Sequence, residues 1–110
     1  MTSKAGDALR DAKVFLLLLN PQYFNGPLGP ATLQTAIEAQ KPIVLVNLRE
    51  RGLRDPPEFT AYQGPKLVIR NLDDISGGRM RMFMSRHGAY GADPNFEFDY
   101  ETGIGLIAEP

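Results

Sequence analysis

The chain has 110 residues, a formal net charge of −1 and a sequence pI near 5.8. This balance gives no general attraction to nucleic acid or to an anionic membrane, so we expect neither as a partner. The sequence contains no cysteine, which excludes disulfides, thiolate chemistry and cysteine-based zinc sites. The length, with 43% hydrophobic and 23% charged residues, is typical of one soluble domain, and we expect residues 1–110 to form it.

The N-terminal segment is polar and does not resemble a signal peptide. Alanine and leucine recur at helical spacing over residues 4–12, which predicts a short helix there. The longest apolar run, from Val14 to Leu19, is far too short to span a membrane. We therefore expect a cytoplasmic protein.

Three continuous apolar runs predict strands that are covered on both faces, as in a parallel sheet. They give strands over residues 13–19, 42–47 and 66–71. Between the first two, a helical pattern begins at Pro30 and ends at Gln40. Strand, helix and strand in this order predict a βαβ unit with a right-handed crossover.

The second half of the chain predicts a connection, a helix and a hairpin. The segment "RERGLRDPPEF" (49–59) is charged and rich in proline, so we expect a surface connection. Asp73, Asp74 and Ser76 are candidate caps for a helix around 79–87. Apolar and acidic residues then alternate, which predicts a β-hairpin. Its strands cover residues 96–100 and 104–108.

An Asn-Pro turn and a Lys-Pro pair frame the first predicted helix. Asn20-Pro21-Gln22-Tyr23-Phe24 ends the first strand, and Lys41-Pro42 leads into the second. The arrangement, over about residues 5–47, resembles the middle of a TIR (Toll/interleukin receptor) domain, where a Ser-Pro-x-Tyr-Leu turn, a glutamate-bearing helix and Lys-Pro follow each other. It is also similar to the glutamate helix and Gly-Lys-Pro of nucleoside deoxyribosyltransferases. The chain is thus a piece of a larger domain, a shortened relative or an unrelated α/β protein.

The resemblance implies a site but not a catalyst. Both families place their catalytic glutamate at position 32, which is Thr32 here, and threonine is neither an acid nor a base near neutral pH. In open parallel sheets, ligands bind beyond the carboxyl ends of the strands. We therefore expect Asn20, Tyr23, Gly29 and Thr32 to line a ligand crevice, with no catalytic residue and no metal. The alternative is that Asn-Pro and Gly-Pro are ordinary loop chemistry.

These patterns predict an α/β fold, with a small flavodoxin-like or TIR-like sheet, flanking helices and a C-terminal hairpin. We expect a non-catalytic TIR-like module for protein interaction or nucleotide-ligand sensing, without a cofactor. One alternative is an enzyme that cleaves or transfers an N-glycosidic bond of NAD or a nucleoside, with its acid elsewhere. A second alternative is a small structural or accessory protein without a ligand.

The helix around 79–87 is unusually apolar on more than one face. Met80, Met82, Phe83 and Met84 exceed what one helix face would bury. Methionine adapts well to binding surfaces, so we expect self-association, most simply as a dimer, or a protein partner bound through Met80, Met82 and Phe83.

Overall fold

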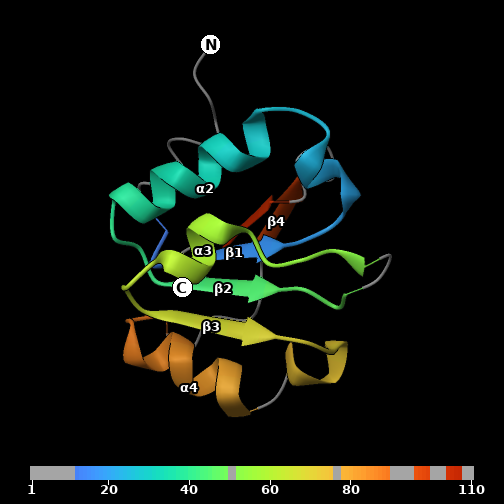
Figure 1. Ribbon diagram of the computed structural model, residues 1–110. Helices are drawn as coiled ribbons and strands as arrows, with labels where there is room; N and C mark the ends of the chain where they lie inside the picture. Colours follow the sequence, from blue (N-terminus) through green and yellow to red (C-terminus); the bar gives the residue numbers. More distant parts are fainter. Residues whose placement is uncertain (1–11, 50–51, 76–77, 90–95, 100–103, 108–110) are drawn as a thin grey trace.

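The structure is a computed structural model that describes residues 12–49, 52–75, 78–89, 96–99 and 104–107. These residues form a five-stranded sheet of spatial order β3-β2-β1-β5-β4, with helices on both faces (Figure 1). The strands are β1 (Val14–Leu18), β2 (Ile43–Val46), β3 (Lys66–Ile69), β4 (Phe96–Asp99) and β5 (Ile104–Ile107). The α-helices are α2 (Leu28–Glu38), α3 (Pro57–Ala61) and α4 (Gly78–Arg86), and the 3-10 helices are η1 (Pro21–Phe24) and η3 (Leu72–Ile75).

Three parallel strands confirm the predicted α/β class. β1 pairs in parallel with β2, and β2 pairs in parallel with β3. All three lie within the predicted ranges, and each is two residues shorter than predicted. β1 and β2 are continuously apolar because both faces of the sheet are covered there, whereas β3 begins with the exposed Lys66.

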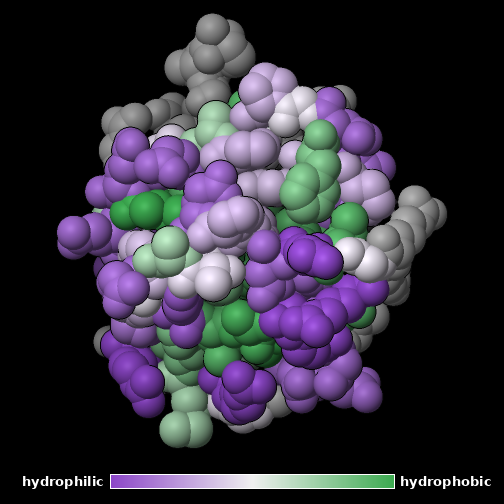
Figure 2. Space-filling view, in the orientation of Figure 1, coloured by the Kyte–Doolittle hydropathy of each residue, from purple (hydrophilic) through white to green (hydrophobic). Residues whose placement is uncertain are grey.

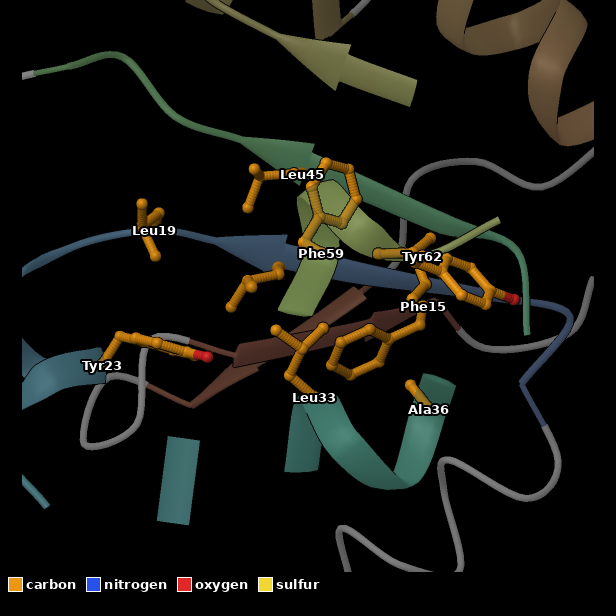
Figure 3. Close-up of a cluster of buried hydrophobic side chains, with 10 residues drawn as sticks. Phe15, Leu19, Tyr23, Leu33, Ala36, Leu45, Phe59 and Tyr62 are labelled. Atoms are coloured by element: carbon orange, nitrogen blue, oxygen red, sulfur yellow. The ribbon is translucent and has the colours of Figure 1, made fainter. Parts of the chain in front are cut away.

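Side chains of β1 alternate between two apolar clusters, one on each face of the sheet. Phe15 and Leu17 belong to the cluster that α2 and α3 cover (Figure 3). Val14 and Leu16 belong to the cluster that α4 covers from the opposite side. The central strand is therefore almost completely buried.

The sequence pattern missed helix α3, which lies within and just beyond the predicted surface connection. Pro57 stands in its first turn, where a missing N–H removes no helical hydrogen bond. Phe59 is only 2% exposed and joins the cluster shown in Figure 3. Five residues are too few to produce a helical periodicity, so the two prolines indicated only a loop.

Both α2 and α4 end in a Schellman motif. At the end of α2, the amide of Lys41 donates to the carbonyl of Ala36 with an N···O distance of 3.0 Å, and Gln40 has a φ of 56°. At the end of α4, the left-handed position is held by Gly88, with a φ of 86°. The helix α2 therefore ends two residues before the predicted Gln40, and it begins two residues before Pro30.

The predicted C-terminal hairpin joins the main sheet of its own chain. β5 is antiparallel to β1, with Phe15 opposite Leu106, and β4 is antiparallel to β5. The observed strands agree with the predicted ranges to within one residue. β1 consequently has a neighbour on each side, and its edge is not open to pairing with another molecule.

Most of the apolar residues on α4 pack in the core of their own chain. Met80, Phe83 and Met84 are buried against the sheet, whereas Met82 is 63% exposed. Helices α2 and α3 pack against one face of the parallel strands, and α4 packs against the other.

Three further predictions concern the ends of helices and the membrane. Asp73 and Asp74 lie inside η3 and not at the first turn of α4, while Ser76 lies outside the described residues. The predicted N-terminal helix, 4–12, also lies outside them except for Ala12. Within the described part of the chain, no helix is both long enough and apolar enough to cross a membrane.

Candidate functional site

The carboxyl ends of the three parallel strands lie on the same side of the sheet (Figure 1). A polar residue follows each of the strands closely in the sequence. Asn20 comes two residues after β1, Asn47 directly after β2 and Arg70 directly after β3. The crevice beyond the carboxyl ends of strands is where open α/β sheets bind ligands. These residues are therefore the starting point for a candidate site.

Three of the four predicted ligand-binding residues lie in a packed corner after β1, which we call the β1 corner. The Oδ1 of Asn20 accepts a hydrogen bond from the amide of Gln22 at 3.0 Å and caps η1. Tyr23 is buried, with its ring extending toward Leu33 (Figure 3). A Cβ on Gly29 would lie 2.9 Å from the Tyr23 carbonyl oxygen, so only glycine permits this approach. The packing explains all three residues, and their role in ligand binding stays a prediction.

Thr32, the fourth predicted residue, directs its hydroxyl into its own helix. Its Oγ1 donates to the carbonyl oxygen of Leu28 at 2.9 Å. The acid of α2, Glu38, lies at the opposite end of the helix, where its carboxylate accepts a hydrogen bond from Gln34 at 3.1 Å. The helix therefore provides no carboxylate at the position where the resembling families carry their catalytic glutamate.

The phenol of Tyr23 is a weak acid in this environment. Burial raises its pKa, and the negative charge of Glu58 on α3 raises it further, to about 12. Tyr23 therefore stays protonated across the physiological range and cannot serve as a base there. The same interaction shows that an acidic side chain stands near the β1 corner.

Asn47 organises a second group of polar residues, at the end of β2. Its side chain is fully buried, and all of its principal hydrogen-bonding capacity is used. The Nδ2 donates to Asp55 Oδ1 at 2.8 Å and to the Leu53 carbonyl at 3.2 Å. The Oδ1 accepts from the amide of Arg49 at 2.9 Å, an Asx turn like that of Asn20 after β1. Asn47 thus binds the loop after β2 both at its start, through Arg49, and further along, through Leu53 and Asp55.

Asp55 links this loop to β3 through a bidentate ion pair. Arg70 NH1 and NH2 donate to Asp55 Oδ1 and Oδ2, both at 2.8 Å. The hydrogen bonds from Arg70, with that from Asn47, hold the pKa of Asp55 below its ordinary value, although partial burial opposes them. The carboxylate therefore stays ionised near neutral pH and acts as an anchor. We call Asn47, Asp55 and Arg70 the β2 network.

A hollow of about 440 Å³ lies against the β2 network. Hydrophilic side chains gather over the carboxyl ends of β2 and β3 on the face shown in Figure 2. The hollow is lined by Arg49, Gly52, Leu53, Arg54 and Asp55. Its volume lies within the roughly 300–1,000 Å³ that is usual for small-molecule sites.

The loop around the hollow adopts two left-handed backbone conformations. Arg49 has a φ of 60° and Gly52 a φ of 70°. For glycine this conformation is free of steric cost, whereas for arginine it is uncommon. The Asx turn at Asn47 fixes the backbone of Arg49 and offsets that cost. Such strain, held by buried hydrogen bonds, is frequent at ligand sites.

The sequence carries a local signal for two residues of this site, but not for the way they meet Asp55. A polar residue stands directly after each of two strands, Asn47 after the fully apolar "IVLV" and Arg70 after "KLVI", whose last three residues are apolar. Adjacent parallel strands bring those positions together at one edge. Between Asn47 and Arg70, Asp55 is the first acidic residue along the described part of the chain. Pro56 and Pro57, which follow it, are typical of a loop and indicate nothing about a site.

Among the described residues, no group of three or more histidine, aspartate or glutamate side chains is placed to hold a metal ion. No protein-family model, curated protein or solved structure matches the chain.

Proposed function

We propose that the chain is a non-catalytic module of TIR-like arrangement that senses a nucleotide ligand or binds a protein, with its ligand site at the carboxyl end of β2. The observation that carries this proposal is the hollow beside the β2 network. A fully buried, hydrogen-bonded asparagine and a bidentate ion pair hold the loop that shapes the hollow. Such pre-organisation lowers the entropy lost when a ligand binds.

We expect no catalysis by Asp55 or by Thr32. Asp55 lines the hollow, but its lowered pKa and its three hydrogen bonds make it a poor proton donor. Thr32 has no charge to stabilise an oxocarbenium ion, and its hydroxyl is engaged with Leu28. A carboxylate in that position commonly contributes several kcal/mol of transition-state stabilisation.

A titration with turnover control tests the proposal. The ¹⁵N-labelled chain is titrated with NAD, adenosine monophosphate and deoxynucleosides, and amide shifts are mapped along the sequence. The same mixtures are then assayed for cleavage by chromatography. We expect shifts at residues 47–55 and no turnover above a denatured control. Turnover by the wild type, or no binding by any of these compounds, would overturn the proposal. A gain of turnover in Thr32→Glu would indicate a decayed enzyme site.

A second candidate function, an enzyme acting on an N-glycosidic bond, is favoured by one observation. Glu58 stands close enough to Tyr23 for its charge to raise the tyrosine pKa. A carboxylate near the β1 corner could replace the glutamate missing at Thr32. This enzyme would cleave NAD or a nucleoside, and Glu58→Gln would abolish turnover while Glu38→Gln would not.

We also propose that the module acts in the cytoplasm and self-associates as a dimer. Met82 supports the dimer because it is the residue of the apolar α4 cluster that stays exposed. Met80 and Phe83 pack in the chain's own core, so they would not contact a partner directly and could only hold Met82 in place. Light scattering across a dilution series tests the dimer. A constant monomer mass would exclude it, and loss of the dimer mass in Met82→Glu would locate the interface on α4.

A further inference from the structure

We infer that the hollow at the end of β2 recognises the phosphate group of a small phosphomonoester through Arg49 and Arg54. This inference rests on the proposed ligand-sensing function and names the chemical group that the site would bind. Four observations carry it: the local charge, the free donors, the fixed loop and the size of the hollow.

The local charge is positive although the chain as a whole is not. Among the described residues at the hollow and in the β2 network, Arg49, Arg54 and Arg70 stand against the single carboxylate of Asp55, which leaves an excess of +2. The whole chain carries a net charge of −1. A phosphomonoester carries about −1.5 to −2 at pH 7, so one such group would neutralise this excess. A monocarboxylate would neutralise only half of it.

The donors available at the hollow are guanidinium groups. The amides of Arg49 and Gly52 are engaged, the first with Asn47 Oδ1 at 2.9 Å and the second with the Arg49 carbonyl at 3.2 Å. The guanidinium of Arg70 is committed to Asp55. Those of Arg49 and Arg54 make no hydrogen bond to another residue that the structure describes. Each presents a planar set of five N–H donors that suits phosphate oxygens.

The β2 network fixes the two arginines without neutralising them. The backbone of Arg49 is held by Asn47, and Arg54 directly precedes Asp55, which is anchored on both sides. Because Asp55 is paired with Arg70, its negative charge is largely compensated and opposes an incoming anion less. The remaining wall, Gly52 and Leu53, is uncharged, and the hollow of about 440 Å³ has room for a small body attached to the phosphate.

The test compares matched ligands on the full chain by calorimetry and by amide shifts. Adenosine monophosphate and inorganic phosphate carry the proposed group, adenosine lacks it, and succinate carries two carboxylates instead. We expect adenosine monophosphate to bind at least tenfold more tightly than adenosine, with shifts at residues 47–55. Added sodium chloride should weaken the binding, because exposed charges are screened.

Single variants assign the phosphate to its residues. Arg49→Ala and Arg54→Ala should each weaken adenosine monophosphate at least tenfold, while binding of adenosine stays the same. Arg81→Ala is the matched control, since Arg81 is an exposed arginine on α4, and its affinity should equal that of the wild type. Thermal unfolding of each variant is measured beside its binding, so that a loss of fold is not read as a loss of contact.

Other outcomes overturn the inference in distinguishable ways. If adenosine binds at 47–55 as tightly as its monophosphate, or succinate binds more tightly, the phosphate assignment is wrong and the sensing function stands. If the arginine variants bind adenosine monophosphate as the wild type does, the assignment is also wrong. If none of the four compounds binds, the inference and the proposed function fail together.

Discussion

Replacing Asp55 by asparagine should destabilise the fold by an amount that depends on pH. The change keeps the shape of the side chain but removes its charge and replaces one acceptor oxygen by an NH2 donor, so that only one of the two 2.8 Å hydrogen bonds from Arg70 can remain. A hydrogen bond to a charged group contributes about 1.5–3 kcal/mol. The Arg70 side chain is 37% exposed and that of Asp55 is 19% exposed, so solvent screens part of the attraction. We expect Asp55→Asn to lower the free energy of unfolding by about 2 kcal/mol at pH 7.

The size of the effect makes it measurable by thermal unfolding. An unfolding entropy of about 2.1 cal/mol/K per residue converts this loss into a fall in Tm of roughly 9 °C. Urea titration followed by circular dichroism gives the free energy directly. Glu38→Gln is the matched control, since Glu38 is an exposed carboxylate whose partner is the neutral Gln34. Its effect should stay within about 0.5 kcal/mol.

The pH dependence distinguishes the ion pair from simple packing. The pKa of Asp55 is lowered in the folded state, so the unfolded chain binds the proton first as the pH falls. The stabilisation is therefore complete above the ordinary aspartate pKa and is lost as the pH falls through the lower folded value. The gap between wild type and Asp55→Asn should shrink below about pH 4. A gap that stays constant down to pH 2.5, or one that is absent at pH 7, would refute the reasoning.

Three other predictions concern single residues outside the β2 network. Gln40→Gly should raise stability by about 0.5–1 kcal/mol, because glycine adopts the positive φ of 56° without steric cost; chemical denaturation measures it, and a loss would contradict the assigned Schellman motif. Gly29→Ala should lower stability by about 1–3 kcal/mol, because its Cβ would stand 2.9 Å from the Tyr23 carbonyl; an unchanged Tm would show that the β1 corner is loosely packed. Burial, and then the charge of Arg86, lowers the pKa of His87, so stability is full above the ordinary histidine pKa of 6.5 and falls as the pH drops through the folded value. In His87→Gln, the free energy of unfolding from urea titration should no longer be lower at pH 5 than at pH 7 because of this group. If the difference between the two pH values persists, other groups cause it.

The strands could be predicted because their signal is local. A run such as "IVLV" is apolar at every position only if both faces of the strand are covered, and this holds for β2. The hairpin was predictable for the complementary reason, since its sequence alternates with period two. The pairing of β5 with β1 covers an edge of the central strand that would otherwise stay open.

The site could not be read in the same way because its residues meet only in space. Asn47, Asp55 and Arg70 are separated by 8 and 15 residues along the chain, and no periodic pattern connects them. Helix α3 could not be predicted, because a helix of five residues is too short to show a helical periodicity. At the β1 corner, Gly29 lies against the ring and backbone of Tyr23, and this close packing is a contact in space that the sequence pattern does not reveal.

The position of β5 beside β1 sets the order in which this sheet can assemble. Phe15 pairs with Ile43, only 28 positions along the chain, whereas Val14 pairs with Ile107, 93 positions along. Closing the longer loop costs about 1 kcal/mol more in chain entropy, so the β1–β2 unit should form first. During synthesis, β1 leaves the ribosome long before β5 exists. During that interval, the edge of the apolar strand β1 that later pairs with β5 stays unpaired. A nascent or C-terminally truncated chain should therefore be the form that aggregates or recruits chaperones.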